Sequence, residues 1–181
     1  IQAFVDGEHL VAMPAAQDHP HAFEGNKGPI TGGMGSYSDT NHLLPFLSQE
    51  EYDASVEIMK ETIDAIAKEA EPYKGILYGQ FMITKDGPKV IEYNARFGDP
   101  ETQVVLPRMK NDIVEVFEAC VDGTLDQVEL EFEDNAAVCV VLASAGYPLA
   151  YEKGLPISGL ETFKEKDSYF GNRRFVKRFT F

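Results

Sequence analysis

The chain has 181 residues, of which 44% are hydrophobic, and this is enough apolar sequence for one well-buried domain or for a domain with an appended lobe. Lys and Arg number 16 against 30 Asp and Glu, so the formal net charge is -14 and no broad basic surface is available for nucleic acid or for an anionic membrane. No apolar run approaches the roughly 20 residues that a membrane-spanning helix needs.

The first part of the chain predicts a β-hairpin followed by a long loop. Residues 1–4 and 9–12 flank Asp6 and Gly7, a pair that suits a tight turn because both positions tolerate positive φ. Residues 14–41 are rich in Gly, Pro, His and Asn and show no sustained period. A loop of this length in a compact domain is usually functional, so this is the first place to look for a site.

A helix and a second hairpin are expected next. Ser48 followed by Glu51 predicts a capping box at the start of the helix. Apolar residues then recur at helical spacing along one stripe, at Tyr52, Val56, Met59, Ile63 and Ile66. Residues 75–84 and 89–93 read as two strands joined by a turn at residues 85–87.

The second half predicts two helices, a strand and a small lobe. Asp99 is expected as the N-cap of a helix that has Pro100 in its first position and continues to residue 106. A helix over residues 112–121 should end at Gly123, and the apolar run 136–143 is typical of a covered strand. An acidic segment within residues 125–135 suggests a division into residues 1–130 and a β-rich lobe at residues 131–181.

The cysteines indicate the redox compartment of the protein, and the start of the chain indicates whether residues precede it. Cys120 and Cys139 are far apart among apolar neighbours, which favours two buried free thiols and a reducing, cytoplasmic location. The basic residues near the end are expected on a solvated terminal strand. The chain starts at Ile1 inside a predicted strand, so we expect the natural protein to have residues before it.

The most informative stretch covers residues 91–103. On a strand, Glu92, Asn94 and Arg96 alternate onto one face, which would bring a carboxylate, an amide oxygen and a guanidinium together. Mg²⁺ prefers such oxygen ligands, and arginine offers a forked donor to phosphate, so this set suits a magnesium-bound polyphosphate. Alternatively, these residues form an edge strand with solvated polar side chains, followed by an ordinary capped helix.

A second stretch, residues 28–37, contains four glycines. Their backbone N–H groups could approach a ligand closely and cradle an anion. The stretch matches neither a Walker A loop nor the dinucleotide-binding glycine pattern. A plain surface turn is the alternative.

Taken together, the two stretches resemble the ATP-grasp ligases that join glycine to phosphoribosylamine. The family's pattern Gly-Pro-x-Thr-Gly-Gly-Met-Gly occupies residues 28–35, and its signature Glu-Tyr-Asn-x-Arg-Phe-Gly-Asp-Pro-Glu-Thr-Gln occupies residues 92–103 without a break. The resemblance covers roughly residues 1–159. It implies an α+β fold: the C-terminal portion of an ATP-grasp domain, an antiparallel sheet with packed helices, followed by a small β-rich lobe.

The resemblance also implies roles for particular residues. Glu92 and Asn94 would bind Mg²⁺ or Mn²⁺, and Arg96 would be catalytic by steadying the phosphoryl group. The pocket for glycine and the ribosyl phosphate would be lined by Gly28, Pro29, Thr31, Gly32, Gly33, Met34, Gly35, Ser36, Asp99, Pro100 and Glu101.

The implied reaction uses only small-molecule substrates. ATP, glycine and 5-phosphoribosylamine would give glycinamide ribonucleotide, ADP and phosphate through a glycyl phosphate, as a step of de novo purine biosynthesis. The 181 residues alone could fold and still be inactive. The alternatives are another ATP-grasp carboxylate–amine ligase and a non-catalytic nucleotide-binding module.

Several details qualify the resemblance. The family often has basic residues just after the Gln-Asp-His at residues 17–19, where this chain has Pro20 and His21. Gln80 stands twelve residues before Glu92, where many ATP-grasp enzymes have a metal carboxylate, so the metal should rely more on the oxygens of ATP. Residues 171–181 no longer resemble the family's closing lobe. The two acids of the segment at residues 99–101 are expected to have different roles. Asp99 should cap the helix, and Glu101 should point outward and contact the amine of a substrate.

Overall fold

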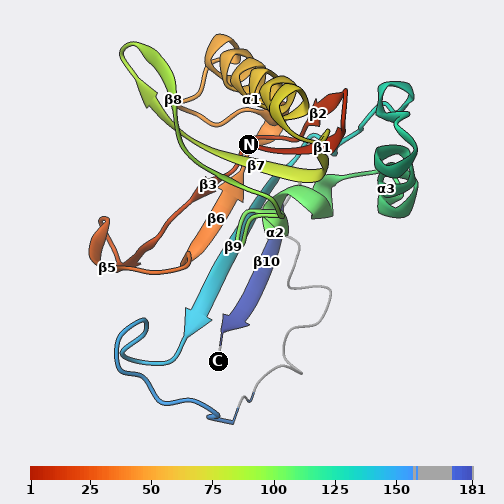
Figure 1. The fold of residues 1–181 in the computed structure, drawn as a ribbon. Helices are drawn as coiled ribbons and strands as arrows, with labels where there is room; N and C mark the ends of the chain where they lie inside the picture. The colour runs from red at the N-terminus through yellow and green to blue at the C-terminus, as the bar shows by residue number, and fades with distance from the viewer. Residues whose placement is uncertain (157, 159–172, 181) are drawn as a thin grey trace.

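The computed structural model describes residues 1–156, 158 and 173–180, and within them the strands form two four-stranded sheets and one two-stranded sheet (Figure 1). The first sheet has the order β2-β1-β7-β8, and every neighbouring pair in it is antiparallel. Its strands are β1 (Gln2–Asp6), β2 (Leu10–Ala12), β7 (Lys74–Thr84) and β8 (Gly87–Asn94). Both predicted hairpins are therefore confirmed.

The turn of the first hairpin lies one residue later than predicted. Val5 pairs with Leu10, and the backbone N–H of Asp6 donates to His9 O at 3.2 Å, so the turn is centred on Gly7 and Glu8 rather than on Asp6 and Gly7. The reason is local. The Asp6 carboxylate accepts hydrogen bonds from the backbone N–H groups of Glu8 at 3.0 Å and His9 at 2.7 Å, which stabilises the turn at this position.

The second sheet joins segments from both halves of the chain. Its order is β10-β9-β6-β3, with β10 parallel to β9 and the other pairs antiparallel. Its strands are β3 (Gln17–Asp18), β6 (Gly35–Ser38), β9 (Ala136–Ala143) and β10 (Arg173–Thr180). Since β9 pairs with β6, the strand after residue 130 shares a sheet with the earlier part of the chain, and the division at that residue stays a prediction.

The predicted loop over residues 14–41 is wrong in part, because it contains four short strands. Besides β3 and β6, the strands β4 (His21–Phe23) and β5 (Lys27–Ile30) form a small hairpin that projects from the body, labelled at β5 in Figure 1. Strands of two to four residues are too short to show a period in the sequence.

Strand β9 is less covered than its apolar run suggested. Its residues alternate between buried and accessible, with Val140 44% and Leu142 47% exposed, so only one of its faces is buried in the described part of the chain. Cys120 and Cys139 are buried and unbridged, as predicted.

The long helix α1 (Gln49–Glu69) lies across one face of the first sheet (Figure 1). Its Met59 and Ile63 pack with Ala3, Val5 and Leu77 in one core cluster. The capping box is confirmed: Ser48 Oγ accepts from Glu51 N at 3.2 Å, and Glu51 Oε2 accepts from Ser48 N at 2.9 Å.

Ser48→Ala should lower the free energy of unfolding by about 1 kcal/mol, because it removes the Oγ acceptor of the Glu51 N–H at the helix start and the hydroxyl that donates to Glu51 Oε2. Urea unfolding of the full-length protein measures this. Glu57→Ala is the matched control, because it removes only an exposed 3.9 Å ion pair with Lys60. Equal losses in the two variants would contradict the capping role.

Short helices close the space between the two sheets. They are η1 (Thr40–His42), α2 (Thr102–Val105), η2 (Leu106–Arg108), α3 (Ile113–Asp122) and η3 (Leu125–Gln127). Val104, Val105, Val116 and Cys139 share a core cluster with Phe4 of β1. Helix α3 ends at Gly123, whose φ of 74° is left-handed, as predicted.

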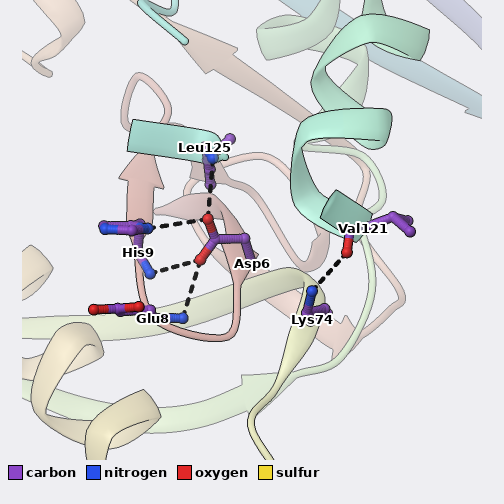
Figure 2. A network of polar contacts seen from close by, with 6 residues as sticks. All are labelled: Asp6, Glu8, His9, Lys74, Val121 and Leu125. Atoms are coloured by element: carbon purple, nitrogen blue, oxygen red, sulfur yellow. Dashed lines mark hydrogen bonds and ion pairs between the residues drawn. The ribbon is translucent and has the colours of Figure 1, made fainter. Parts of the chain in front are cut away.

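The buried carboxylate of Asp6 ties the first hairpin to η3 (Figure 2). Its Oδ2 accepts from His9 Nδ1 at 3.0 Å and from the backbone N–H of Leu125 at 3.0 Å, which lies 119 residues further along the chain. Nearby, Lys74 Nζ donates to the carbonyl of Val121 at the end of α3. These contacts fix η3 and α3 against the end of β1 and the start of β7, the two central strands of the first sheet.

In the part of the chain that the structure describes, no helix is both long and apolar enough to cross a membrane.

Candidate active site

Glu92 and Asn94 lie on the same face at the end of β8, as their spacing predicts. Asn94 Nδ2 donates to Glu92 Oε1 at 3.0 Å, so the two side chains are in direct contact. Glu92 is exposed and Asn94 is half-buried. Gln80 of β7 is the cross-strand partner of Glu92, so a second amide faces this position.

The alternation of side chains does not extend to Arg96. Strand β8 ends at Asn94, and the exposed Arg96 guanidinium donates through Nη1 to the carbonyl of Phe97 at 2.8 Å. Its catalytic role stays a prediction.

The oxygen donors of this face suit a hard divalent cation, because a carboxylate and an amide carbonyl are ligands that Mg²⁺ accepts. Within the described residues no group of three or more His, Cys, Asp or Glu side chains could hold a metal ion. A metal held by Glu92 and Asn94 therefore needs further oxygens from a ligand. The sequence predicts the same, because Gln80 stands where many ATP-grasp enzymes have a second metal carboxylate.

The glycine-rich stretch is not one continuous loop. Its first residues belong to β5, its last belong to β6, and residues 31–34 connect the two strands. Several of its N–H groups already have partners: Thr31 N donates to Pro20 O, Gly33 N to Thr31 Oγ1, and Met34 N to His19 O. These three amides are not free to cradle an anion, which favours the surface-turn interpretation for them.

The two signature stretches meet in the folded chain. Ser36 Oγ donates to the carbonyl of Pro100 at 2.7 Å across 64 residues of sequence. Gly33 has a φ of 118°, and a Cβ there would overlap Pro100 Cδ and lie 2.9 Å from Asp18 Oδ1. A glycine is required at this position because the backbone of residues 31–34 packs directly on the residue 98–101 segment.

Gly33→Ala should lower the free energy of unfolding by about 2 kcal/mol, because the added methyl group clashes with Pro100 and the residue must keep a left-handed φ. Gly32→Ala is the matched control. Its φ is ordinary, and the nearest atom to an added Cβ is Tyr147 Oη at 3.9 Å. Urea unfolding of both variants tests the contact, and a Gly33 variant as stable as the Gly32 variant would contradict it.

Asp99 is not the N-cap of the following helix, so this prediction is wrong. Helix α2 begins at Thr102, and Glu101 occupies the N-cap position without a side-chain capping bond. The exposed Asp99 accepts through Oδ1 from Gln103 Nε2 at 2.7 Å instead. The chain makes a turn at residues 98–101 before the helix starts, and this moves Asp99 out of the capping position.

Glu101 does not reach outward either. It is only 3% exposed, and its Oε1 accepts from the Tyr78 hydroxyl at 2.7 Å. Its Oε2 occupies the space that a Cβ on Gly98 would take, and this buried oxygen has no hydrogen-bond partner within the part of the chain that the structure describes. The glycine at position 98 therefore lets the Glu101 side chain fold back under its own turn.

The Tyr78 hydroxyl links Glu101 to the Glu92 face. Gln80 Nε2 donates to Tyr78 Oη at 3.1 Å, and the same hydroxyl donates to Glu101 Oε1. Burial raises the pKa of Tyr78 above its ordinary value, and the neighbouring Glu101 raises it further, so the hydroxyl remains a donor.

Two residues in this region, Asp18 and Arg108, were given no role by the sequence analysis. Asp18, within the Gln-Asp-His at residues 17–19, is half-buried beside this turn, and its Oδ1 has no hydrogen-bond partner among the residues described. Burial raises the pKa of Asp18 to about 6, with a further contribution from Glu101. Arg108 is fully buried and donates to Ser38 Oγ at 2.9 Å and to the carbonyl of Glu133. These bonds connect β6 to the segment that precedes β9 and stabilise β6.

Comparison with known proteins decides the family. Residues 1–102 match the family model described as the ATP-grasp (A) domain of phosphoribosylglycinamide synthetase. The chain belongs to this family. The ATP-grasp resemblance and the α+β fold class are thereby confirmed.

Relatives of the synthetase family extend the similarity beyond residue 102. The chain is 69% identical over 148 residues to a phosphoribosylamine–glycine ligase of Methanosphaera stadtmanae, which covers 82% of this chain and 33% of the relative. A ligase of the same name from Methanobrevibacter smithii is 68% identical over 148 residues, covering 82% of this chain and 34% of the relative. The chain thus spans about a third of the length of these relatives.

A solved synthetase structure shares the fold. The crystal structure of phosphoribosylamine–glycine ligase from Thermotoga maritima matches with a TM-score of 0.70 and 34% identity, over 88% of this chain and 40% of that chain. The described arrangement of sheets and helices is therefore that of the corresponding part of a synthetase.

Proposed function

We propose that the chain is the C-terminal part of an enzyme that joins glycine to 5-phosphoribosylamine at the expense of ATP, giving glycinamide ribonucleotide, ADP and phosphate. The relatives that carry the ligase name support this reading. The observation that carries it is the contact of the glycine-rich motif with the residue 98–101 turn, through Ser36 and Pro100. This contact supports a single site to which both motifs of the resemblance would contribute.

Glu92 and Asn94 would hold Mg²⁺ or Mn²⁺ together with oxygens of the nucleotide, because their oxygen atoms fit a hard cation and lie on one exposed face. The bound metal ion would supply charge neutralisation for the phosphates of ATP. Arg96 lies just past the strand end, and its exposed guanidinium donates to the carbonyl of the neighbouring Phe97, so it can turn to a phosphoryl oxygen at little cost.

The reaction has two balanced steps. A carboxylate oxygen of glycine attacks the γ-phosphorus of ATP, the bond to the β-phosphate oxygen breaks, and ADP leaves. The amine nitrogen of phosphoribosylamine then attacks the acyl carbon of glycyl phosphate, inorganic phosphate leaves, and the nitrogen loses a proton. The protein contributes mainly positioning and charge neutralisation, because phosphoryl transfer requires little covalent chemistry from side chains.

A coupled ADP-release assay on the full-length enzyme tests the proposal. ADP should form only when glycine and phosphoribosylamine are both present, and a divalent metal ion should be required. Release that needs another carboxylic acid or another amine would assign the chain to a different ATP-grasp ligase. Nucleotide binding without any turnover would support a non-catalytic module.

A further inference from the structure

The Tyr78 hydroxyl contacts two side chains of the proposed site region, Gln80 beside the Glu92 face and Glu101 in the turn at residues 98–101. Tyr78 lies on β7 and is only 6% exposed. On one side its hydroxyl accepts from Gln80, the cross-strand partner of Glu92. On the other side it donates to Glu101, whose turn packs against the glycine-rich motif.

Each contact has a physical consequence for its partner. The Tyr78 hydroxyl donates a hydrogen bond to one oxygen of the Glu101 carboxylate, and the second, buried oxygen has no hydrogen-bond partner among the described residues. Removal of that donor would leave a buried carboxylate unsatisfied, which is costly and would favour movement of the turn. Gln80 would at the same time lose the acceptor that fixes the direction of its amide.

We propose that Tyr78 is a positioning residue. Its hydroxyl orients Gln80 beside the Glu92 metal face and Glu101 beneath the glycine-rich motif. It thereby keeps the metal face and the glycine-rich motif in a fixed position relative to each other. This inference rests on the proposed metal role of Glu92 and on the proposed function. Partners one step removed from a metal ligand commonly change metal affinity or activity by about 10- to 100-fold when they are replaced.

The test uses Tyr78→Phe in the full-length enzyme, with Tyr93→Phe as the matched control. Tyr93 lies on the neighbouring strand β8, and its hydroxyl contacts Thr62 Oγ1 of α1 at 2.9 Å, on the opposite side of the sheet from Glu92. Both variants lose one phenolic hydroxyl. Only the Tyr78 variant loses a contact to Gln80 and Glu101.

The first readout is Mn²⁺ binding in the presence of a non-hydrolysable ATP analogue, followed by electron paramagnetic resonance. Tyr78→Phe should raise the Mn²⁺ dissociation constant about 10-fold, whereas Tyr93→Phe should leave it within about twofold of the parent. Equal affinities for Mn²⁺ in the parent and in Tyr78→Phe would overturn the inference. This readout does not depend on glycine or phosphoribosylamine, so failure of the proposed reaction and failure of the inference are distinguishable.

A double-mutant cycle with Gln80→Ala identifies the route. If Tyr78 acts through Gln80, the effect of Tyr78→Phe on Mn²⁺ affinity should largely disappear in the Gln80→Ala background. Additive losses of Mn²⁺ affinity would show that Tyr78 acts independently of Gln80, and they would overturn the proposed link from its hydroxyl through Gln80 to the metal face. Thermal unfolding of all variants checks that folded protein is compared in every case.

Discussion

Glu92→Gln in the full-length enzyme should lower turnover by about 100-fold with little change in thermal stability, because the variant removes the negative charge that Glu92 contributes to the expected metal site, where the other expected ligand, Asn94, is neutral. The Glu92 side chain is exposed and accepts a hydrogen bond from Asn94. Glutamine has nearly the same shape, so the fold should tolerate it. Steady-state kinetics across a range of Mg²⁺ concentrations and a melting curve measure both effects.

A neighbouring carboxylate provides the control for this variant. Asp86, in the turn of the same hairpin, is exposed and forms only a 3.8 Å ion pair with Lys85. Asp86→Asn should therefore leave turnover unchanged. If Glu92→Gln and the parent turn over equally fast at saturating Mg²⁺, Glu92 is not a metal ligand and its contact with Asn94 is structural.

Asp6→Ala should lower the free energy of unfolding by about 3 kcal/mol, because it removes a buried carboxylate that satisfies several N–H donors at once. The buried N–H of Leu125 would lose its acceptor, and the hairpin would lose its link to η3 (Figure 2). Urea unfolding at neutral pH measures the loss. Glu8→Ala is the control, because the Glu8 side chain is exposed and only its backbone N–H contacts Asp6.

The same network predicts how stability depends on pH. Burial by itself would raise the pKa of Asp6, but hydrogen bonds from His9, Glu8 and Leu125 outweigh burial and lower this pKa from 3.8 to about 2. The stabilisation is therefore present above about pH 4 and is lost as pH falls toward 2.

His9 contributes with the opposite sign. Its hydrogen bond with Asp6 raises the pKa of the imidazole above 6.5, so its share of the stability is present below pH 6.5 and is lost as pH rises through the raised value. His9→Ala should remove the loss at high pH while keeping the loss at low pH. A parent whose stability is flat from pH 3 to 9 would contradict both assignments.

The sequence predicts the elements whose signals are local. The capping box at Ser48 and Glu51, the apolar stripe of α1 and the glycine that ends α3 each lie within a few residues of one another. Glu92 and Asn94 share a face for the same reason, since side chains alternate along any strand. The family signature was also readable directly from the order of residues.

Other features depend on contacts between distant segments, and the sequence predictions for them were wrong or absent. Asp99 has the residue type and the following proline of an N-cap, but the turn at residues 98–101 ends later than the pattern indicates. Glu101 looks like a surface acid, yet Tyr78 of β7 and Gly98 create a buried place for it. Nothing near position 101 in the sequence records a hydroxyl that comes from 23 residues away.

By itself, the sequence determined the family, the main helices, both hairpins and the shared face of Glu92 and Asn94, because periodicity, capping and strand alternation act over a few residues. Only the tertiary structure decided that the glycine-rich motif packs on the residue 98–101 turn and that Tyr78 connects Gln80 with Glu101. Burial and hydrogen-bond partners of a polar side chain are set by whichever segments pack around it, and that packing is fixed only when the sheets and helices assemble.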